Sequence, residues 1–276
     1  EVIEKYGADV LRLLVAASDY HEEVRVSDEI LGRLAEAYRR IRNTSRFLLG
    51  SLFDFNVEAD AVPYERMLWL DRWALARTAE LADRCTRAYS HYEFHIPFHE
   101  IVRFCTVDMG GFYLDVLKDR LYCDAADSLE RRSAQTALYH ILDVLVRLIA
   151  PVLVHTAEEI WQHMPEPKPF ESVHLAQWAD VSAWRRPELL EAMEPFFALR
   201  RGVLRALEQA RADGQIGTSL QAEVVAEAPA SVVSALGFTP QQLADWLMVA
   251  SVELRALPST GAPPAEGEDA WQVSVH

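Results

Sequence analysis

The sequence has few cysteines and no long uncharged apolar run. Its three cysteines, Cys85, Cys105 and Cys123, lie far apart and form no Cys-x-x-Cys pair, so neither a disulfide framework nor a zinc site is indicated. We expect three buried, reduced thiols in a cytoplasmic protein. Even the apolar stretch 138–154 contains His, Asp and Arg side chains, whereas a membrane helix needs roughly 18 consecutive apolar residues. Membrane insertion is therefore not predicted.

Lysine is also scarce, and acidic residues outnumber basic ones. Only three of the 27 basic residues are lysines, and 42 acidic residues bring the formal net charge to −15. That balance argues against a nucleic-acid partner, which needs basic surface. The local field within a Debye length of roughly 10 Å matters more, however, and arginines are concentrated in two stretches. Residues 32–47 contain five arginines and one glutamate, and residues 200–211 contain Arg200, Arg201, Arg205 and Arg211 against Glu208.

No arrangement of residues typical of an active site is present. The sequence has no Gly-rich phosphate loop and no Gly-x-Ser-x-Gly element. His95 and His99 are four residues apart, but no glutamate completes an H-E-x-x-H metal site. Glu158 and Glu159 are adjacent on a predicted helix and point in different directions. We predict no catalytic residue and no metal site in this chain, and we expect it to be part of a longer protein.

Helical periodicity dominates residues 23–165 and predicts an antiparallel bundle. Ser27 precedes two acidic residues and is a typical N-cap for a long helix. At about 100° per residue, Arg39, Arg42 and Arg46 share one flank of its apolar stripe, while Arg33 and Arg40 lie on the far side. The stripe consists of Leu31, Leu34, Tyr38, Ile41, Ser45 and Leu48. Further helices are predicted at 64–89, at 98–122 with a break near Gly110 and Gly111, and at 131–163 with a kink at Pro151.

A Pro-rich stretch at 165–169 predicts the boundary to a smaller α+β region. We expect a mainly α protein in three parts: a short segment 1–22, the helical bundle 23–165 and the α+β region 166–276. The last part is predicted to contain a helix at 187–212, strands at 222–226, 248–256 and 270–275, and a flexible loop at 258–269.

Several segments, taken in order, resemble the isoleucyl-tRNA synthetase family of class I aminoacyl-tRNA synthetases. They are Tyr6-Gly7-Ala8-Asp9, Ser27-Asp28-Glu29-Ile30-Leu31, Tyr38-Arg39-Arg40-Ile41-Arg42-Asn43-Thr44, Leu70-Asp71-Arg72-Trp73, Lys118-Asp119-Arg120-Leu121-Tyr122, Arg131-Arg132-Ser133-Ala134 and Ala157-Glu158-Glu159-Ile160-Trp161. The resemblance covers roughly residues 1–165 and continues more faintly over 208–220. The His-x-Gly-His and Lys-Met-Ser-Lys-Ser elements of the family do not occur, nor does a Cys-Pro-x-Cys zinc element.

The resemblance implies a tRNA-binding part of an enzyme that joins isoleucine to its tRNA with ATP and Mg²⁺. The chain itself would lack the catalytic and editing sites and hold no cofactor; many family members carry a zinc site nearer their C-terminus, and the parent enzyme would be a monomer. The tRNA-binding residues it suggests are Arg39, Arg40, Arg42, Asn43 and Arg46, with Lys118, Arg120, Arg131 and Arg132 as secondary candidates. The aromatic residues Trp73, Phe104, Tyr113 and Trp161 are expected in the core.

Alternatives remain at this point. Tyr38 and Phe47 could stack on an unpaired base, although their spacing favours core packing. Arg12 could reach tRNA or brace a domain junction. The chain could be a helical protein–protein interaction module whose arginine face meets an acidic partner, or the matching region of a valyl- or leucyl-tRNA synthetase.

Overall fold

The computed structural model describes residues 2–21, 26–257 and 271–276. The chain divides into two compact units, Glu1–Arg186 and Pro187–His276. None of the helices in these ranges is long and apolar enough to cross a membrane.

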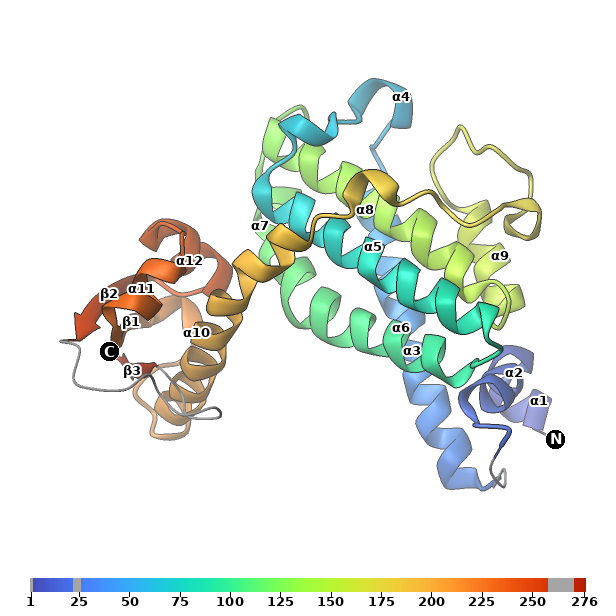
Figure 1. Ribbon diagram of the computed structural model, residues 1–276, viewed down its shortest axis with the longest axis horizontal. Helices are drawn as coiled ribbons and strands as arrows, with labels where there is room; N and C mark the ends of the chain where they lie inside the picture. The colour runs from blue at the N-terminus through green and yellow to red at the C-terminus, as the bar shows by residue number, and fades with distance from the viewer. Residues whose placement is uncertain (1, 22–25, 258–270) are drawn as a thin grey trace. The chain divides into compact units, whose positions relative to one another are not determined.

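The first unit is the antiparallel helical bundle that the periodicity predicts (Figure 1). Helix α5 packs along α8, and α3 and α7 also contact α8. Trp73, Phe104, Tyr113 and Trp161 are all buried, as expected of core residues. The helices are α1 (Val2–Tyr6), α2 (Ala8–Ala17), α3 (Asp28–Ser51), α4 (Val57–Asp60), α5 (Trp69–Ser90), α6 (His95–Arg103), a π-helix (Phe104–Tyr113), α7 (Leu114–Cys123), α8 (Leu129–Ile149) and α9 (Val154–Gln162). Short 3₁₀ turns lie at Tyr64–Arg66, Val173–Leu175 and Ser182–Trp184.

Helix α3 begins where the sequence predicts. The Ser27 hydroxyl accepts a hydrogen bond from the Ile30 amide, which satisfies one of the free N–H groups of the first turn. The predicted stripe is the buried face of the helix, except that Tyr38 is half-buried. The Tyr38 hydroxyl lies 3.0 Å from the Thr156 hydroxyl of α9. Tyr38 therefore helps to pack α3 against α9.

Two predicted helices differ in detail. Pro151 does not kink one long helix, because α8 ends at Ile149 and α9 starts at Val154. The pair Gly110 and Gly111 does not break its helix but lies within the π-helix. A Cβ atom added at Gly111 would lie 3.0 Å from the Thr106 carbonyl oxygen. Glycine avoids this close contact with the backbone of the π-helix.

The first unit extends to Arg186, beyond the Pro-rich stretch predicted as its end. The segment after α9 packs back on the bundle: the Trp161 indole donates to the Phe170 carbonyl at 3.0 Å, and Arg147 donates to the Gln177 carbonyl at 2.8 Å. Arg185 is ion-paired with Asp83 of α5 at 2.8 Å. The prolines follow the last long helix of the bundle, whereas the compact unit ends at Arg186, 21 residues after the predicted boundary at residue 165.

The second unit combines helices with a three-stranded sheet. Its order is β2-β1-β3, with β1 parallel to β2 and antiparallel to β3. Helix α10 packs on β3, where Gly202 approaches Val273. The elements are α10 (Pro187–Ala212), a 3₁₀ turn (Ser219–Gln221), β1 (Glu223–Pro229), α11 (Ala230–Ala235), α12 (Pro240–Leu247), β2 (Ser251–Leu257) and β3 (Gln272–Val275). The predicted helix and strands are found, while the predicted loop 258–269 and residue 270 lie outside the described residues.

The cysteines only partly follow the expectation. Cys85 and Cys105 are buried, and burial raises the pKa of each thiol to about 12. Cys123, the last residue of α7, is exposed, so the prediction of three buried thiols is wrong at this position. Cysteine is usually buried, but Cys123 lies where α7 ends at the surface, so its residue type alone does not predict its exposure.

Candidate nucleic-acid interface

Helix α3 carries a row of exposed arginines, Arg39, Arg42 and Arg46, which we call the cationic strip. All three side chains are exposed, on the flank opposite to Arg33 and Arg40. Arg39 is ion-paired with Glu36 at 3.2 Å. Arg42 and Arg46 have no hydrogen-bond or ion-pair partner within the part of the chain that the structure describes. Two guanidinium groups of the strip are therefore available to an external anion.

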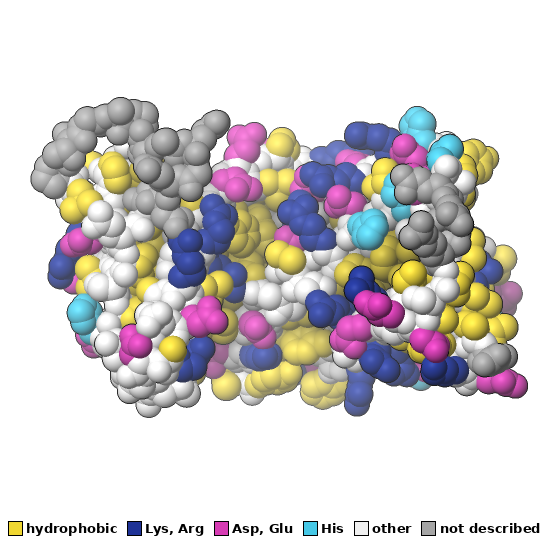
Figure 2. Space-filling model, turned by 90° about the horizontal axis from the view of Figure 1, so that it is seen from below, with side chains coloured by type: hydrophobic (Ala, Val, Ile, Leu, Met, Phe, Trp, Pro, Cys, Tyr) yellow, Lys and Arg dark blue, Asp and Glu magenta, His cyan; other side chains and the backbone are white. Residues whose placement is uncertain are grey.

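The other predicted contacts on α3, Arg40 and Asn43, lie outside the strip. Arg33 is ion-paired with Glu29, and Arg40 lies 3.9 Å from the Glu36 carboxylate. Asn43 is exposed and has no hydrogen-bond partner among the described residues. In the view of Figure 2, basic side chains alternate with acidic and apolar ones and form no broad cationic surface. The strip is thus a local feature of an acidic protein.

Arg120, a secondary candidate, is part of a buried network around Asp71. The Asp71 carboxylate is fully buried and accepts hydrogen bonds from Arg120 at 2.6 and 3.2 Å. It also accepts from the Tyr113 hydroxyl at 2.8 Å and from the Ser133 hydroxyl at 2.5 Å. Burial and the nearby carboxylate raise the pKa of Tyr113 well above its usual range. The predicted tRNA contact by Arg120 does not fit this position, because its guanidinium is committed to the interior.

Arg131 and Arg132 are held in the same way by Asp54. Their side chains are only 11% and 15% exposed, and their guanidinium groups lie 2.9 and 3.7 Å from the Asp54 carboxylate. Arg132 also lies 3.4 Å from Asp60. The predicted tRNA contacts of these two arginines do not fit their burial either. Lys118 is different, because it is exposed and its partner among the described residues is Asp115, at 2.6 Å.

The N-terminal helix α2 is attached to the turn between α8 and α9. Arg12 donates to the carbonyl oxygens of Val152 at 2.8 Å and Pro151 at 3.0 Å. Asp9 accepts from the Thr156 amide at 2.8 Å and from its hydroxyl at 2.6 Å. Arg12 therefore attaches α2 to the turn between α8 and α9 within the first unit.

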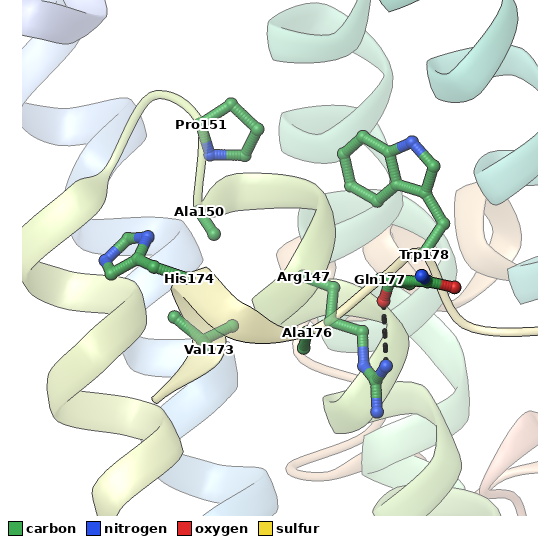
Figure 3. A pocket seen from close by; sticks show the side chains of 8 residues that line it. All are labelled: Arg147, Ala150, Pro151, Val173, His174, Ala176, Gln177 and Trp178. Atoms are coloured by element: carbon green, nitrogen blue, oxygen red, sulfur yellow. Dashed lines mark hydrogen bonds between the residues drawn. The ribbon is translucent and has the colours of Figure 1, made fainter. Parts of the chain in front are cut away.

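A depression of about 540 Å³ lies between the end of α8 and the segment 173–178 (Figure 3). Its rim includes Pro151, His174 and Trp178. Arg147 also lines it, but this guanidinium is bound by Asp143 at 2.8 Å and by the Gln177 carbonyl. Sequence reasoning missed this depression, because it is formed by an irregular segment that folds back on the bundle.

No group of three or more His, Cys, Asp or Glu side chains in the described ranges is arranged to hold a metal ion.

Comparison with known proteins places this geometry in a family. The family model described as "Anticodon-binding domain of tRNA ligase" matches residues 71–226, more than half of the chain. The chain belongs to this anticodon-binding domain family. The match includes α5 to α10 and most of β1.

Two relatives of this anticodon-binding chain are named isoleucine–tRNA ligase. The protein of Syntrophotalea carbinolica is 51% identical over 256 residues, covering 92% of this chain and 28% of the relative. That of Geobacter sulfurreducens is 47% identical over 276 residues, covering 100% of this chain, α3 included, and 30% of the relative. The chain thus spans less than a third of the length of these curated relatives.

A solved structure shares the fold. LeuRS of Agrobacterium radiobacter K84, in a ternary complex with tRNA and LeuAMS, matches 67% of this chain and 21% of its own with a TM-score of 0.51. At 18% identity this likeness supports the fold alone. The predicted mainly α fold and the predicted family are both confirmed.

Proposed function

We propose that this chain is the part of an isoleucine–tRNA ligase that binds the anticodon stem-loop of its tRNA. Membership of the anticodon-binding domain family carries the proposal, since this family is the anticodon-binding domain of tRNA ligases. The identity of 47–51% to proteins named isoleucine–tRNA ligase supports isoleucine over valine or leucine.

The cationic strip is the element of the bundle best suited to the RNA backbone. Arginine makes forked, charge-assisted hydrogen bonds to phosphate oxygens. Arg42 and Arg46 would bind phosphates without first losing an internal ion pair. Arg39 would exchange its exposed pair with Glu36, which costs no more than about 1 kcal/mol. Arg40, Asn43 and Lys118 are exposed and complete the proposed contact set.

In the whole protein, the proposed reaction joins isoleucine to its tRNA with ATP and Mg²⁺ in the cytoplasm. This chain would supply binding free energy and identity reading at one end of the tRNA, while the chemistry takes place in parts of the protein outside it. Phosphate contacts would position the RNA and base contacts would select it.

Salt dependence of RNA binding tests the role of the strip. If about three to five phosphates are neutralised, the logarithm of affinity should fall with the logarithm of salt concentration at a slope of roughly −2 to −4.5. The variant Arg39→Ala/Arg42→Ala/Arg46→Ala should bind more weakly, and its slope should flatten by roughly 2 to 3. Fluorescence anisotropy with a labelled anticodon stem-loop at several salt concentrations measures both quantities.

A matched control is Arg33→Ala, which removes an arginine from the other flank of α3 and outside the proposed contact set. It should leave the slope unchanged, because Arg33 is ion-paired with Glu29 and lies away from the strip. Unchanged affinity and slope in the strip variant would remove the strip from the interface. Binding of an acidic protein with no preference for RNA would instead support an interaction module.

A further inference from the structure

We propose that the depression at the C-terminal end of α3 holds an unpaired nucleobase of the RNA strand whose phosphates lie along the cationic strip. This inference rests on the proposed function and adds a base-stacking site with Phe53 as its platform. The depression has a volume of about 320 Å³, and Leu49, Phe53, Asn56, His163 and Pro165 are among the residues that line it.

The ring of Phe53 is presented to solvent. It is 80% exposed, more than any other large hydrophobic side chain in the described part of the protein. The Arg131 guanidinium lies 5.9 Å from the ring centroid, and the Asp54 carboxylate holds that guanidinium at 2.9 Å. A cation fixed at an aromatic ring favours one ring position and limits its motion. Stacking of a base on the exposed ring would remove apolar surface from water.

The depression continues the strip along the same side of α3. Leu49 follows Arg42 by seven residues and Arg46 by three, so the three side chains lie on one face of the helix. At 1.5 Å per residue, the helix continues for about 7.5 Å from Arg46 to its last residue, Ser51, and Phe53 follows two residues later. One strand could therefore place phosphates on the arginines and the next base on the ring.

The charges around the depression favour a neutral base over a phosphate. Asp54 and Glu166 both line it, and each forms an ion pair within the protein, to Arg131 and to Lys168 at 2.9 Å. The two carboxylates would repel a phosphate placed there, whereas an uncharged base carries no negative charge for them to repel.

Polar groups that could read a base edge are also present. His163 donates from Nδ1 to the Glu159 carbonyl at 2.8 Å, so Nε2 is the ring nitrogen left to contact a base edge. The Asn56 side-chain oxygen caps α4 by accepting from Glu58 and Ala59. The Asn56 NH₂ group has no partner among the described residues and remains a donor.

The test compares Phe53→Ala and Phe53→Trp in the full chain, with a labelled anticodon stem-loop and with a fully paired RNA of the same length. Phe53→Ala should weaken stem-loop binding roughly 5- to 100-fold, as expected for loss of one base–aromatic stack. The salt slope should not change, because no phosphate contact is lost. Phe53→Trp should retain near wild-type affinity, and affinity for the paired RNA should be the same in all three proteins.

Trp178→Ala is the matched control, since it removes a partly exposed aromatic ring from the other depression. Equal weakening by Trp178→Ala and Phe53→Ala would overturn the proposed stack, as would wild-type affinity of Phe53→Ala. Neither outcome would affect the proposed function, because the wild-type protein would still bind RNA with an affinity that falls as salt concentration rises. Absence of salt-sensitive RNA binding by the wild-type protein would overturn both proposals.

Discussion

Replacement of Arg120 by alanine tests whether this residue stabilises the bundle or contacts RNA, because the two roles predict different changes in stability and in RNA affinity. Arg120 is 17% exposed, and its guanidinium donates to both oxygens of Asp71 and to the Glu130 carbonyl at 2.6 Å. Burial by itself lowers the pKa of this guanidinium, but Asp71 more than offsets that effect and the net shift is upward. The guanidinium therefore remains charged inside the bundle.

The expected loss of stability follows from what the substitution leaves behind. In Arg120→Ala, Asp71 would keep the Tyr113 and Ser133 hydroxyls but lose its counter-charge in a fully buried position. Removing one partner of a buried ion pair typically costs about 3–5 kcal/mol. For a domain of this size, that corresponds to a fall in Tm of about 6–20 °C.

Thermal or urea unfolding measures this loss, and Lys118→Ala is the control on the same helix. Lys118 forms an exposed pair with Asp115, so its removal should cost no more than about 1 kcal/mol. At a temperature where both proteins are folded, Arg120→Ala should bind the stem-loop like the wild type. Wild-type stability combined with weaker, less salt-dependent binding would refute the structural role and restore Arg120 as an RNA contact.

Two further predictions concern buried titratable groups. Burial lowers the pKa of His140 to about 4, so the unfolded chain takes up its proton first as pH falls below about 6.5. Between pH 7 and pH 5 the wild type should therefore lose about 2 kcal/mol of unfolding free energy that His140→Phe does not lose; equal losses would contradict this. A thiol reagent should modify Cys123 in the native protein, and reach Cys85 and Cys105 only on unfolding; rapid modification of all three would disprove their burial.

The sequence is sufficient to predict the helical bundle because its signals are local and repeated. Ser27 caps α3, the apolar stripe of α3 is its buried face, and the predicted core aromatics are buried. Local signals do not predict where a unit ends when contacts between distant segments determine that boundary. Residues 166–186 belong to the first unit because of contacts such as Arg185 with Asp83, which no periodicity encodes.

The candidate site shows the same limit. Helical spacing correctly placed Arg39, Arg42 and Arg46 on one exposed flank, because that depends only on α3. The sequence could not separate accessible basic residues from those used inside the fold, since the partners Asp54 and Asp71 are about 50 or more residues away from Arg131 and Arg120. The depression at Phe53 was missed for the same reason, because His163 and Pro165 complete it from after α9.

Comparison of two hairpins tests the central claim most directly. The affinity of the chain for the anticodon stem-loop of isoleucine tRNA would be measured by fluorescence anisotropy beside that of valine tRNA, at two salt concentrations. We predict tighter, salt-sensitive binding of the isoleucine hairpin. Equal binding of the two hairpins, or no binding of either, would contradict anticodon recognition by this chain.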